Sequence, residues 1–508
     1  MTVTAAPKAG RREWIGLAVI ALPCLLYSMD LTVLHLAIPQ LSADLKPSSA
    51  QLLWIIDIYG FLIAGSLLTM GTLGDRIGRR RLLLIGAGAF GAGSVLAAFS
   101  TTAEMLIATR ALLGIAGATL APSTMSLIRN MFHDPKQFTT AIGVWISAYS
   151  VGGAIGPLVG GVVLEFFWWG AVFLIGVPVM VLLLALAPVL LPEYRDPEAG
   201  RPDLLSAALS LAAVLAVIFG LKQIAQDGLA WAPALSLLAG LVLGVAFVRR
   251  QIALADPLID LRLFRVPAFT ASLTLYGFGV FVLFGGYLYG PQYLQLVIGL
   301  SPLEAGLWSL PWAVAFIAGS LLTPRLVGHI RPAFLITGGL VLAAAGFAAL
   351  TRIDTGSGLA LLIAATVAFS LGLAPLFTLT NDLIIGSAPP ERAGAASGIS
   401  ETCAELGGAL GIALFGSIGI AVYRAVMPGA VPGVPLETIT VARDTLGGAV
   451  AIAGQLPDQV GTQLVEVARQ AFTRGMQMTA AISAAGSVAL AVFAALTLRR
   501  VRAASHAG

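Results

Sequence analysis

The sequence predicts an all-α integral membrane protein, built from two bundles of six helices with two extra transmembrane helices between them. Of its 508 residues, 58% are hydrophobic and only 11% are charged, whereas soluble globular proteins are about 25% charged. A helix needs about 20 apolar residues to cross a bilayer, and fourteen apolar runs of roughly that length follow one another along the chain. This composition excludes an ordinary cytosolic enzyme and a disordered chain.

The apolar runs give the predicted helices in order. They lie at 14–39, 52–73, 82–99, 103–127, 138–163, 168–191, 203–223, 230–248, 267–290, 304–324, 332–351, 358–387, 394–423 and 475–498. Charged stretches at 192–202 and 249–266 separate the seventh and eighth helices from the rest. The predicted parts are therefore a cytoplasmic N-terminus (1–13), a six-helix bundle (14–191), a linker region with helices 7 and 8 (192–266), a second six-helix bundle (267–498) and a cytoplasmic tail (499–508).

A segment of about 50 residues at 424–474 interrupts the second bundle. Three prolines open it, and two apolar-periodic stretches follow at 438–454 and 459–473. We expect an external loop that contains two short amphipathic helices.

Lys and Arg residues indicate the orientation of the helices. Most of these residues lie in every second connection between helices, and the connections in between contain few of them. Lys222 is one of the few that are assigned to an external segment. Because cytoplasmic loops carry an excess of Lys and Arg, both termini are expected in the cytoplasm. The same rule explains the net charge of +4, so no nucleic-acid partner is expected.

A short basic loop, GTLGDRIGRRR at 71–81, joins helices 2 and 3. Its glycines allow a tight turn, and its cytoplasmic position accounts for its arginines but not for an aspartate between glycines. The loop resembles the signature of the major facilitator superfamily at this place, with Gly71, Asp75, Arg76, Gly78 and Arg79 at the motif positions.

Three further stretches are similar to motifs of the same superfamily. Residues 106–117 (LIATRALLGIAG) resemble the helix 4 motif with its buried arginine, here Arg110. Residues 30–39 (DLTVLHLAIP) resemble the helix 1 signature of drug:proton antiporters with fourteen helices, although His35 stands where that signature usually has Asn. The helix 5 motif of antiporters is matched at Gly152, Gly156, Pro157, Gly160 and Gly161. Residues 401–408 (ETCAELGG) are similar to the branch that exports quaternary ammonium compounds and cationic dyes.

Charged residues inside the predicted helices need a reason, because each costs about 2.5–3.5 kcal/mol at the bilayer centre. Asp30, Asp57 and Arg110 lie at similar depth in the outer part of the first bundle. We hypothesise that Asp30 or Asp57 exchanges a proton and that the permanent charge of Arg110 controls this exchange. A static ion pair is the alternative.

The second bundle carries an acidic patch. Glu401 and Glu405 are four residues apart and share one helix face, and Asp382 with Asn381 lies near the inner end of the preceding helix. Two carboxylates this close repel each other when both are charged. The pair can therefore hold a proton or an organic cation, and the state with neither bound is unfavourable. Alternatively, the glutamates face polar groups of a neighbouring helix and Asp382 reaches the cytoplasmic interface.

Aromatic rings could line a path for a cation, because a cation over a ring face gains about 0.5–2 kcal/mol. The candidates are Trp145, Tyr149, Tyr293, Trp308, Trp312 and Phe377. Trp and Tyr also gather at membrane interfaces, so a belt position is the alternative.

Asp75 is expected to meet the partly positive N-terminus of helix 13 near Ala393 and to latch the outward-open state.

The resemblance implies a proton-coupled multidrug exporter of lipophilic cations in the plasma (inner) membrane, working by alternating access and powered by a proton gradient without a cofactor. A monomer is the family expectation. An exporter of lipids or other amphipathic metabolites on the same fold is the nearest alternative. An integral membrane enzyme is less expected, because no histidine pairs with a cysteine or carboxylate at metal-ligand spacing and no catalytic residue is predicted.

Overall fold

The computed structural model describes residues 8–195, 203–227, 230–254, 257–259, 261–327, 329–356, 358–387, 393–427 and 436–499. These residues form helices and no strand. Fourteen helical segments in these ranges are long and apolar enough to cross a membrane, so the predicted number of spans is confirmed.

The N-terminal half of the chain contains α1 (Arg11–Leu45), α2 (Ser49–Ile77), α3 (Arg79–Ala98), α4 (Ala103–Gly117), α5 (Leu120–Met131), α6 (Pro135–Phe166), α7 (Ala171–Leu174) and α8 (Gly176–Leu190). The predicted helices 7 and 8 are α9 (Leu204–Asp227) and α10 (Trp231–Ala253). We call these two helices the accessory pair. The C-terminal half contains η1 (Leu263–Arg265), α11 (Pro267–Tyr287), α12 (Gly290–Gln292), η2 (Tyr293–Ile298), α13 (Pro302–Trp308), α14 (Leu310–Val327), α15 (Pro332–Leu350), α16 (Leu359–Gly386), α17 (Ala393–Val426), α18 (Leu436–Asp444), α19 (Leu446–Ala453) and α20 (Asp458–Thr497).

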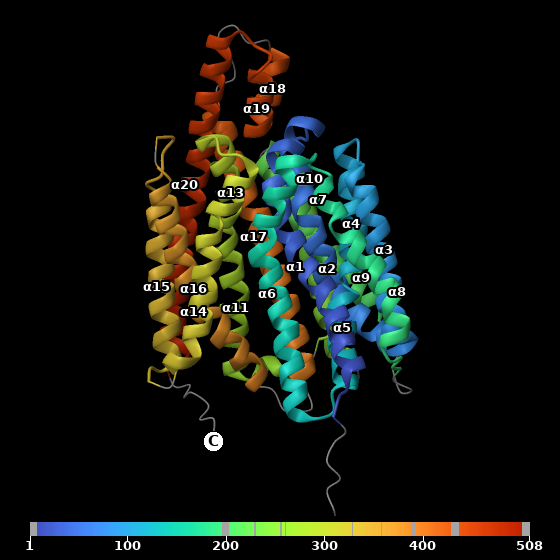
Figure 1. Ribbon diagram of the computed structural model, residues 1–508. Coiled ribbons are helices and arrows are strands. Elements are labelled where there is room, and N and C mark those ends of the chain that lie inside the picture. The colour runs from blue at the N-terminus through green and yellow to red at the C-terminus, as the bar shows by residue number, and fades with distance from the viewer. Residues whose placement is uncertain are drawn as a thin grey trace, which may run out of the picture.

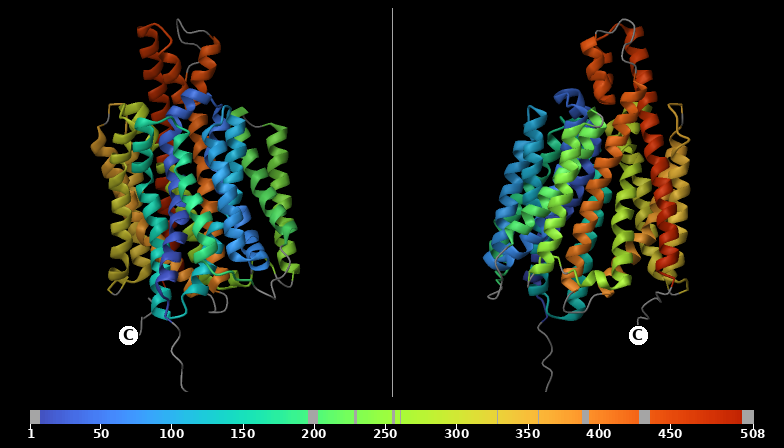
Figure 2. Two further views of the ribbon diagram at one scale, coloured as in Figure 1. Left: turned by 45° about the vertical axis from the view of Figure 1, so that its right-hand side comes forward. Right: turned by 180° about the vertical axis from the view of Figure 1, so that it is seen from behind.

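The long helices run side by side along one common direction (Figures 1 and 2). In the N-terminal half, α1 packs on α6 and α8, and α2 packs on α4. In the C-terminal half, α11 packs on α16, α17 and α20. The accessory helix α9 packs on α10 and also contacts α2 and α17, one helix from each half. The two halves and the accessory pair thus meet around α2 and α17.

The segment 424–474 differs from its prediction. The first amphipathic stretch forms two helices, α18 and α19, while the second is the beginning of α20, a single helix of 40 residues. Pro457 precedes α20, and no proline follows it before Thr497, so nothing in the sequence stops the helix at the predicted boundary. The helices α18 and α19 and the start of α20 project beyond the other helices in Figure 1, and we call this the hairpin end.

The glycines of the helix 5 motif hold α6 close to α1. A Cβ at Gly152 would overlap the carbonyl oxygen of Leu25, and one at Gly156 would overlap the hydroxyl of Thr32. On another face, a Cβ at Gly161 would lie 2.7 Å from the carbonyl oxygen of Pro302 in α13. The motif therefore fixes the helix that carries Asp30 and also joins the two halves.

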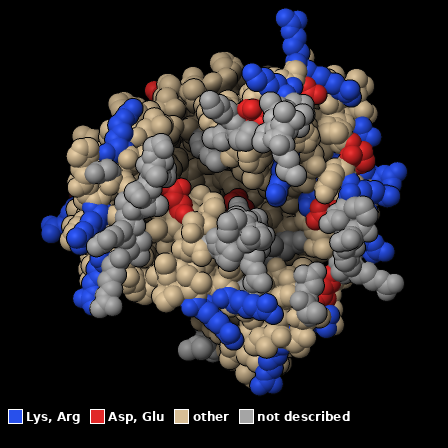
Figure 3. All heavy atoms as spheres, turned by 90° about the horizontal axis from the view of Figure 1, so that it is seen from below, with Lys and Arg blue, Asp and Glu red and all other residues tan. Residues whose placement is uncertain are grey.

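The end of the molecule opposite the hairpin is hollowed. Figure 3 looks onto this end and shows a deep central hollow with acidic side chains beside it. We call it the open end. At the hairpin end, by contrast, α19 packs on α1 of the N-terminal half and α18 packs on α17 of the C-terminal half. The described part of the molecule is therefore open on one side and covered on the other.

Candidate functional site

Asp30 and Arg110 form a buried ion pair between α1 and α4. Arg110 Nη1 lies 2.6 Å from Asp30 Oδ2, and Arg110 is only 1% exposed. The guanidinium also donates from Nε to the carbonyl oxygen of Ile55, at 3.1 Å, and its central carbon lies 4.6 Å from the ring centroid of Tyr59. These contacts use both the charge and the plane of the arginine, which lysine could not reproduce.

Asp57 has a different partner from the one that the sequence suggests. Both of its carboxylate oxygens lie 2.8 Å from Lys222 Nζ in the accessory helix α9. Lys222 is 3% exposed and lies within a membrane-spanning segment, so its assignment to an external connection was wrong. It stands at the end of an apolar run, where hydropathy alone cannot distinguish a loop charge from a charge that faces another helix.

Glu405 lies where the two halves meet. Its Oε1 accepts a hydrogen bond of 2.6 Å from the hydroxyl of Tyr27 on α1, and its Oε2 is 4.0 Å from the position that a Cβ on Gly60 of α2 would take. Glu401 lies one turn before Glu405 on α17. Among the residues that the structure describes, neither glutamate has a Lys, Arg or His within ion-pair distance. Two carboxylates therefore share one helix face, and the described part of the chain places no basic side chain against them.

A chain of aromatic rings connects the arginine to this glutamate. The ring centroid of Tyr27 lies 6.2 Å from that of Tyr59 and 5.6 Å from that of Tyr149, which in turn lies 4.9 Å from Trp145. Tyr59 carries Arg110 on its face. The structure thus brings the predicted residues Trp145 and Tyr149 into contact with Tyr27, the hydrogen-bond donor of Glu405. Tyr27 and Tyr59 were not among the predicted residues, although Tyr27 precedes Asp30 by three residues and so shares its helix face.

The remaining predicted residues are spread over the C-terminal half. Asn381 accepts a 3.4 Å hydrogen bond from the buried Ser400, one residue before Glu401, while Asp382 is exposed. Phe377 packs edge-on against Tyr276.

Three predicted aromatic residues lie elsewhere in this half. Trp312 packs edge-on against Tyr287, and Trp308 is 44% exposed. Tyr293 is fully buried and donates to the carbonyl oxygen of Asp354 at 2.7 Å, so its hydroxyl is engaged within the half rather than offered to a substrate.

The loop motif packs within the N-terminal half. Asp75 accepts a 2.8 Å hydrogen bond from Nε of Arg79, whose Nη1 donates to the carbonyl oxygen of Pro122. Gly78 has φ +112°, and a Cβ there would lie 2.6 Å from the carboxylate of Glu193, so both conformation and space require glycine. Residues 388–392, directly before helix α17, lie outside the described residues, and the latch between Asp75 and this helix stays a prediction.

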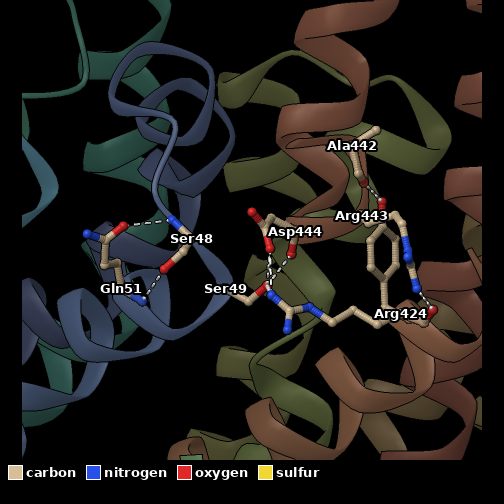
Figure 4. Close-up of polar contacts among 8 residues, drawn as sticks. Ser48, Ser49, Gln51, Arg424, Ala442, Arg443 and Asp444 are labelled. Carbon is tan, nitrogen blue, oxygen red and sulfur yellow. Dashed lines mark hydrogen bonds and ion pairs between the residues drawn. The ribbon is translucent and has the colours of Figure 1, made fainter. Parts of the chain in front are cut away.

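At the hairpin end, a polar cluster connects the halves (Figure 4). Ser49 at the start of α2 donates to the carbonyl oxygen of Asp444 at 2.6 Å, and the carboxylate of Asp444 lies 2.5 Å from Nη2 of Arg424 on α17. Nη2 of Arg424 also donates to the Ser49 hydroxyl at 3.2 Å. We call Ser49, Arg424 and Asp444 the clasp. No sequence motif indicated it, because its three members come from separate parts of the chain.

Two more contacts close this side of the molecule. Gln295 of η2 donates to the carbonyl oxygen of Leu36 on α1 at 3.0 Å. His35, where the helix 1 signature usually has Asn, is buried edge-on against Tyr287 of α11, with ring centroids 5.1 Å apart. In the described residues, no group of three or more His, Cys, Asp or Glu side chains could hold a metal ion.

Comparison with known proteins identifies the family. The model of the major facilitator superfamily matches residues 20–412. The chain belongs to the major facilitator superfamily. It is 44% identical over 490 residues to the multidrug efflux pump LfrA of Mycolicibacterium smegmatis, a match that covers 96% of this chain and 97% of that one. It is 39% identical over 496 residues to the methyl viologen resistance protein SmvA of Salmonella typhimurium, covering 94% and 96% of the two chains.

A solved structure supports the same fold. A bacterial homologue of the human lysosomal transporter Spinster matches with a TM-score of 0.69 and 17% identity, over 98% of this chain and all of the other. With its fourteen candidate spans, the chain is a multi-pass membrane transporter of this superfamily. Its similarity to efflux and resistance proteins supports drug efflux as its activity.

Proposed function

We propose that this protein exports lipophilic organic cations from the cytoplasm in exchange for protons, by alternating access between its two halves. In this proposal the protein lies in the plasma membrane, works as a monomer and has both termini and the open end in the cytoplasm. Quaternary ammonium compounds and cationic dyes are the expected substrates.

The observation that carries this proposal is the pair of glutamates on α17. Glu405 sits between α1 and α17 with a tyrosine as its hydrogen-bond donor. Glu401 lies on the same helix face, and neither has a basic partner in the described ranges. Uncompensated carboxylates in a low-dielectric site are costly. A proton or an organic cation lowers this cost, and one replaces the other because both use the same charge. Such competition for one site is the physical basis of exchange.

The ion pair of Asp30 and Arg110 supplies a second place for proton exchange. Because arginine keeps its proton, any change in the pair's charge must occur at Asp30. When Asp30 takes up a proton, Arg110 loses its counter-ion and keeps its contacts with Tyr59 and the Ile55 carbonyl. Since Tyr59 contacts Tyr27 and Tyr27 binds Glu405, a change at Asp30 is transmitted to the cation site through three touching side chains.

The membrane potential sets the number of protons. One charge moving through 100 mV gains or loses about 2.3 kcal/mol. Export of one monovalent cation for one proton moves no net charge, so that only the pH gradient drives it. SmvA is named for resistance to methyl viologen, which carries two positive charges. Export of such a dication without work against the potential needs at least two protons, and two glutamates could release them.

Transport by the purified protein in proteoliposomes tests the proposal. We would impose a pH gradient, acidic in the lumen, and measure methyl viologen accumulation by the wild type, Glu401→Gln, Glu405→Gln and Asp30→Asn. We expect accumulation by the wild type that an ionophore abolishes and that each carboxylate variant reduces at least tenfold. Glu466→Gln is a matched control, because this exposed glutamate of α20 bonds Gln470 at the hairpin end. A wild type that accumulates nothing, or glutamate variants that match the control, would contradict the proposal.

One observation favours a second substrate class, lipids or other amphipathic metabolites. A cavity of about 630 Å³ lies between the accessory pair and helices α2 and α17, lined almost entirely by apolar side chains such as Phe61, Leu211, Leu241 and Leu406. If lipids are the substrates, the protein should move a fluorescent phospholipid between the two leaflets of the same proteoliposomes. If the glutamate variants stop cation transport and leave lipid movement at the rate of empty vesicles, cations are the substrates.

A further inference from the structure

The accessory helix α9 contributes a charged side chain to the interior of the N-terminal half. Lys222 Nζ lies 2.8 Å from both carboxylate oxygens of Asp57, and the two residues are 3% and 1% exposed. The same ammonium group lies 3.8 Å from the ring centroid of Trp54, one turn before Asp57 on α2. Carboxylate and ring together surround the lysine charge, so that it does not extend along the lipid towards water.

This pair holds α9 on α2 tightly. A buried ammonium or carboxylate that loses its partner costs about 3–5 kcal/mol, so the pair opens far less often while both groups are charged than after the carboxylate is neutralised. Next to the pair, Phe61, Ile218, Ala409 and Ala413 form a separate apolar cluster between α2, α9 and α17. Further along these helices, the accessory pair stands away from α2 and α17 around the 630 Å³ cavity. The ion pair and this cluster therefore attach α9 at one end of its length.

The pair is next to the proposed proton site. Ile55, two residues before Asp57, accepts the hydrogen bond from Arg110, which binds Asp30. The charged groups that face this turn of α2 are thus Lys222 from α9, Arg110 from α4 with its partner Asp30 on α1, and Glu405 from α17. Lys222 is the member of this set that the accessory pair supplies.

We propose that Lys222 is a positioning residue of the transport cycle, which ties the accessory pair to the N-terminal half through Asp57 and releases it when Asp57 binds a proton. This inference rests on the proposed proton exchange and adds Asp57 to the carboxylates that take part in it. The proton adds to one carboxylate oxygen, the carboxyl group becomes neutral, and the ammonium keeps only its weaker contacts with the carboxyl oxygen and Trp54. Because α9 touches a helix of each half, its release allows α17 to move relative to α2.

The test compares four variants with the wild type: Lys222→Met, Lys222→Arg, Asp57→Asn and the double variant Lys222→Met with Asp57→Asn. Each is reconstituted in proteoliposomes, and two activities are measured with methyl viologen. The first is accumulation driven by a pH gradient, at several pH values. The second is exchange of labelled for unlabelled substrate without a gradient, which reports folding and substrate binding. Arg474→Met, which removes a positive charge from an exposed position of α20 where the arginine donates a hydrogen bond to Gln477, three residues further on, is the control.

We expect Lys222→Met to lower gradient-driven accumulation at least tenfold and to keep substrate exchange within about twofold. Its residual activity should also show a pH profile that differs from that of the wild type, because the carboxylate has lost its neighbouring cation. Lys222→Arg should keep the coupled activity. The double variant contains no unpaired charge, so it should fold and exchange substrate but remain uncoupled.

Two results would overturn the inference. If the double variant regains gradient-driven accumulation with the wild-type pH profile, the pair is only a structural contact. The same holds if Lys222→Met matches Arg474→Met in both assays. A wild type that moves no cation under a pH gradient contradicts the proposed function itself, and the coupling role of Lys222 with it, whereas a coupled wild type with a coupled double variant rejects the role of Lys222 alone.

Discussion

The clasp at the hairpin end predicts how much the two halves are held together on that side. Replacing Ser49 with Ala removes the hydroxyl that donates to the Asp444 carbonyl at 2.6 Å and accepts from Arg424 at 3.2 Å. The ion pair of Arg424 and Asp444 joins two helices of the C-terminal half and stays in place. The substitution therefore removes the two hydrogen bonds by which the clasp joins the halves, and it leaves the other contacts between the halves in place.

The expected size of the effect follows from these contacts. An intramolecular hydrogen bond contributes a net 0.5–1.5 kcal/mol, so two of them hold the closed side by about 2 kcal/mol. That energy corresponds to a change of roughly thirtyfold in the ratio of closed to open molecules. We expect Ser49→Ala to raise the population that is open at the hairpin end by up to this factor, without lowering the yield of folded protein.

Distances between spin labels would measure this shift. Ala43 of α1 and Val426 of α17 are exposed residues of opposite halves near the clasp. Each would be changed to Cys in a background that lacks Cys24 and Cys403, the two native cysteines.

A second serine variant provides the control. Ser147→Ala removes a hydroxyl that bonds only the preceding turn of its own helix, through the carbonyl oxygen of Gly143. If Ser49→Ala leaves the distance distribution identical to that of Ser147→Ala, the clasp does not hold the halves and the reasoning is refuted.

Three further predictions concern packing and charge. Gly156→Ala should lower the melting temperature, because overpacking against α1 costs about 1–3 kcal/mol, whereas Gly153→Ala, with nothing within 4 Å, should leave it unchanged or raise it slightly. Asp30→Asn should lower it as well, by leaving a buried arginine unpaired; an unchanged melting temperature would show that the arginine finds another partner. Asp203 directly precedes α9. Burial alone would raise the pKa of its carboxyl group, but hydrogen bonds from Arg250 and Ser206 outweigh this effect and lower the pKa to about 2. Asp203→Asn should therefore destabilise the protein equally from pH 8 to pH 5, and the difference from the wild type in thermal melts should fade only below about pH 4.

Much of the fold follows from the sequence because the bilayer imposes a simple rule. Every span needs about 20 apolar residues, and the fourteen apolar runs match the fourteen spans. The prediction was wrong at 459–473, because this amphipathic stretch was interpreted as a short helix separate from the last span, whereas both belong to α20. A helix can continue from water into lipid without a break, and only a proline or a turn signal would have shown otherwise.

The candidate site was predicted in part. Asp30, Arg110 and Glu405 attract attention in the sequence because charges in spans are expensive. Their partners are harder to predict, since Tyr27 binds Glu405 across 378 positions of the chain and Lys222 binds Asp57 across 165. Periodicity places a residue on a helix face but does not say which helix that face meets. The clasp was missed for the same reason.

Competition between proton and cation at Glu401 and Glu405 is the central claim, and proton release on substrate binding tests it most directly. Methyl viologen would be added to the purified protein in weakly buffered detergent solution, and the protons released per bound substrate counted with a pH indicator. The account predicts release by the wild type and by Glu466→Gln, and a clear loss of release in Glu401→Gln and Glu405→Gln. Saturable binding of methyl viologen by the wild type without any release of protons would contradict it.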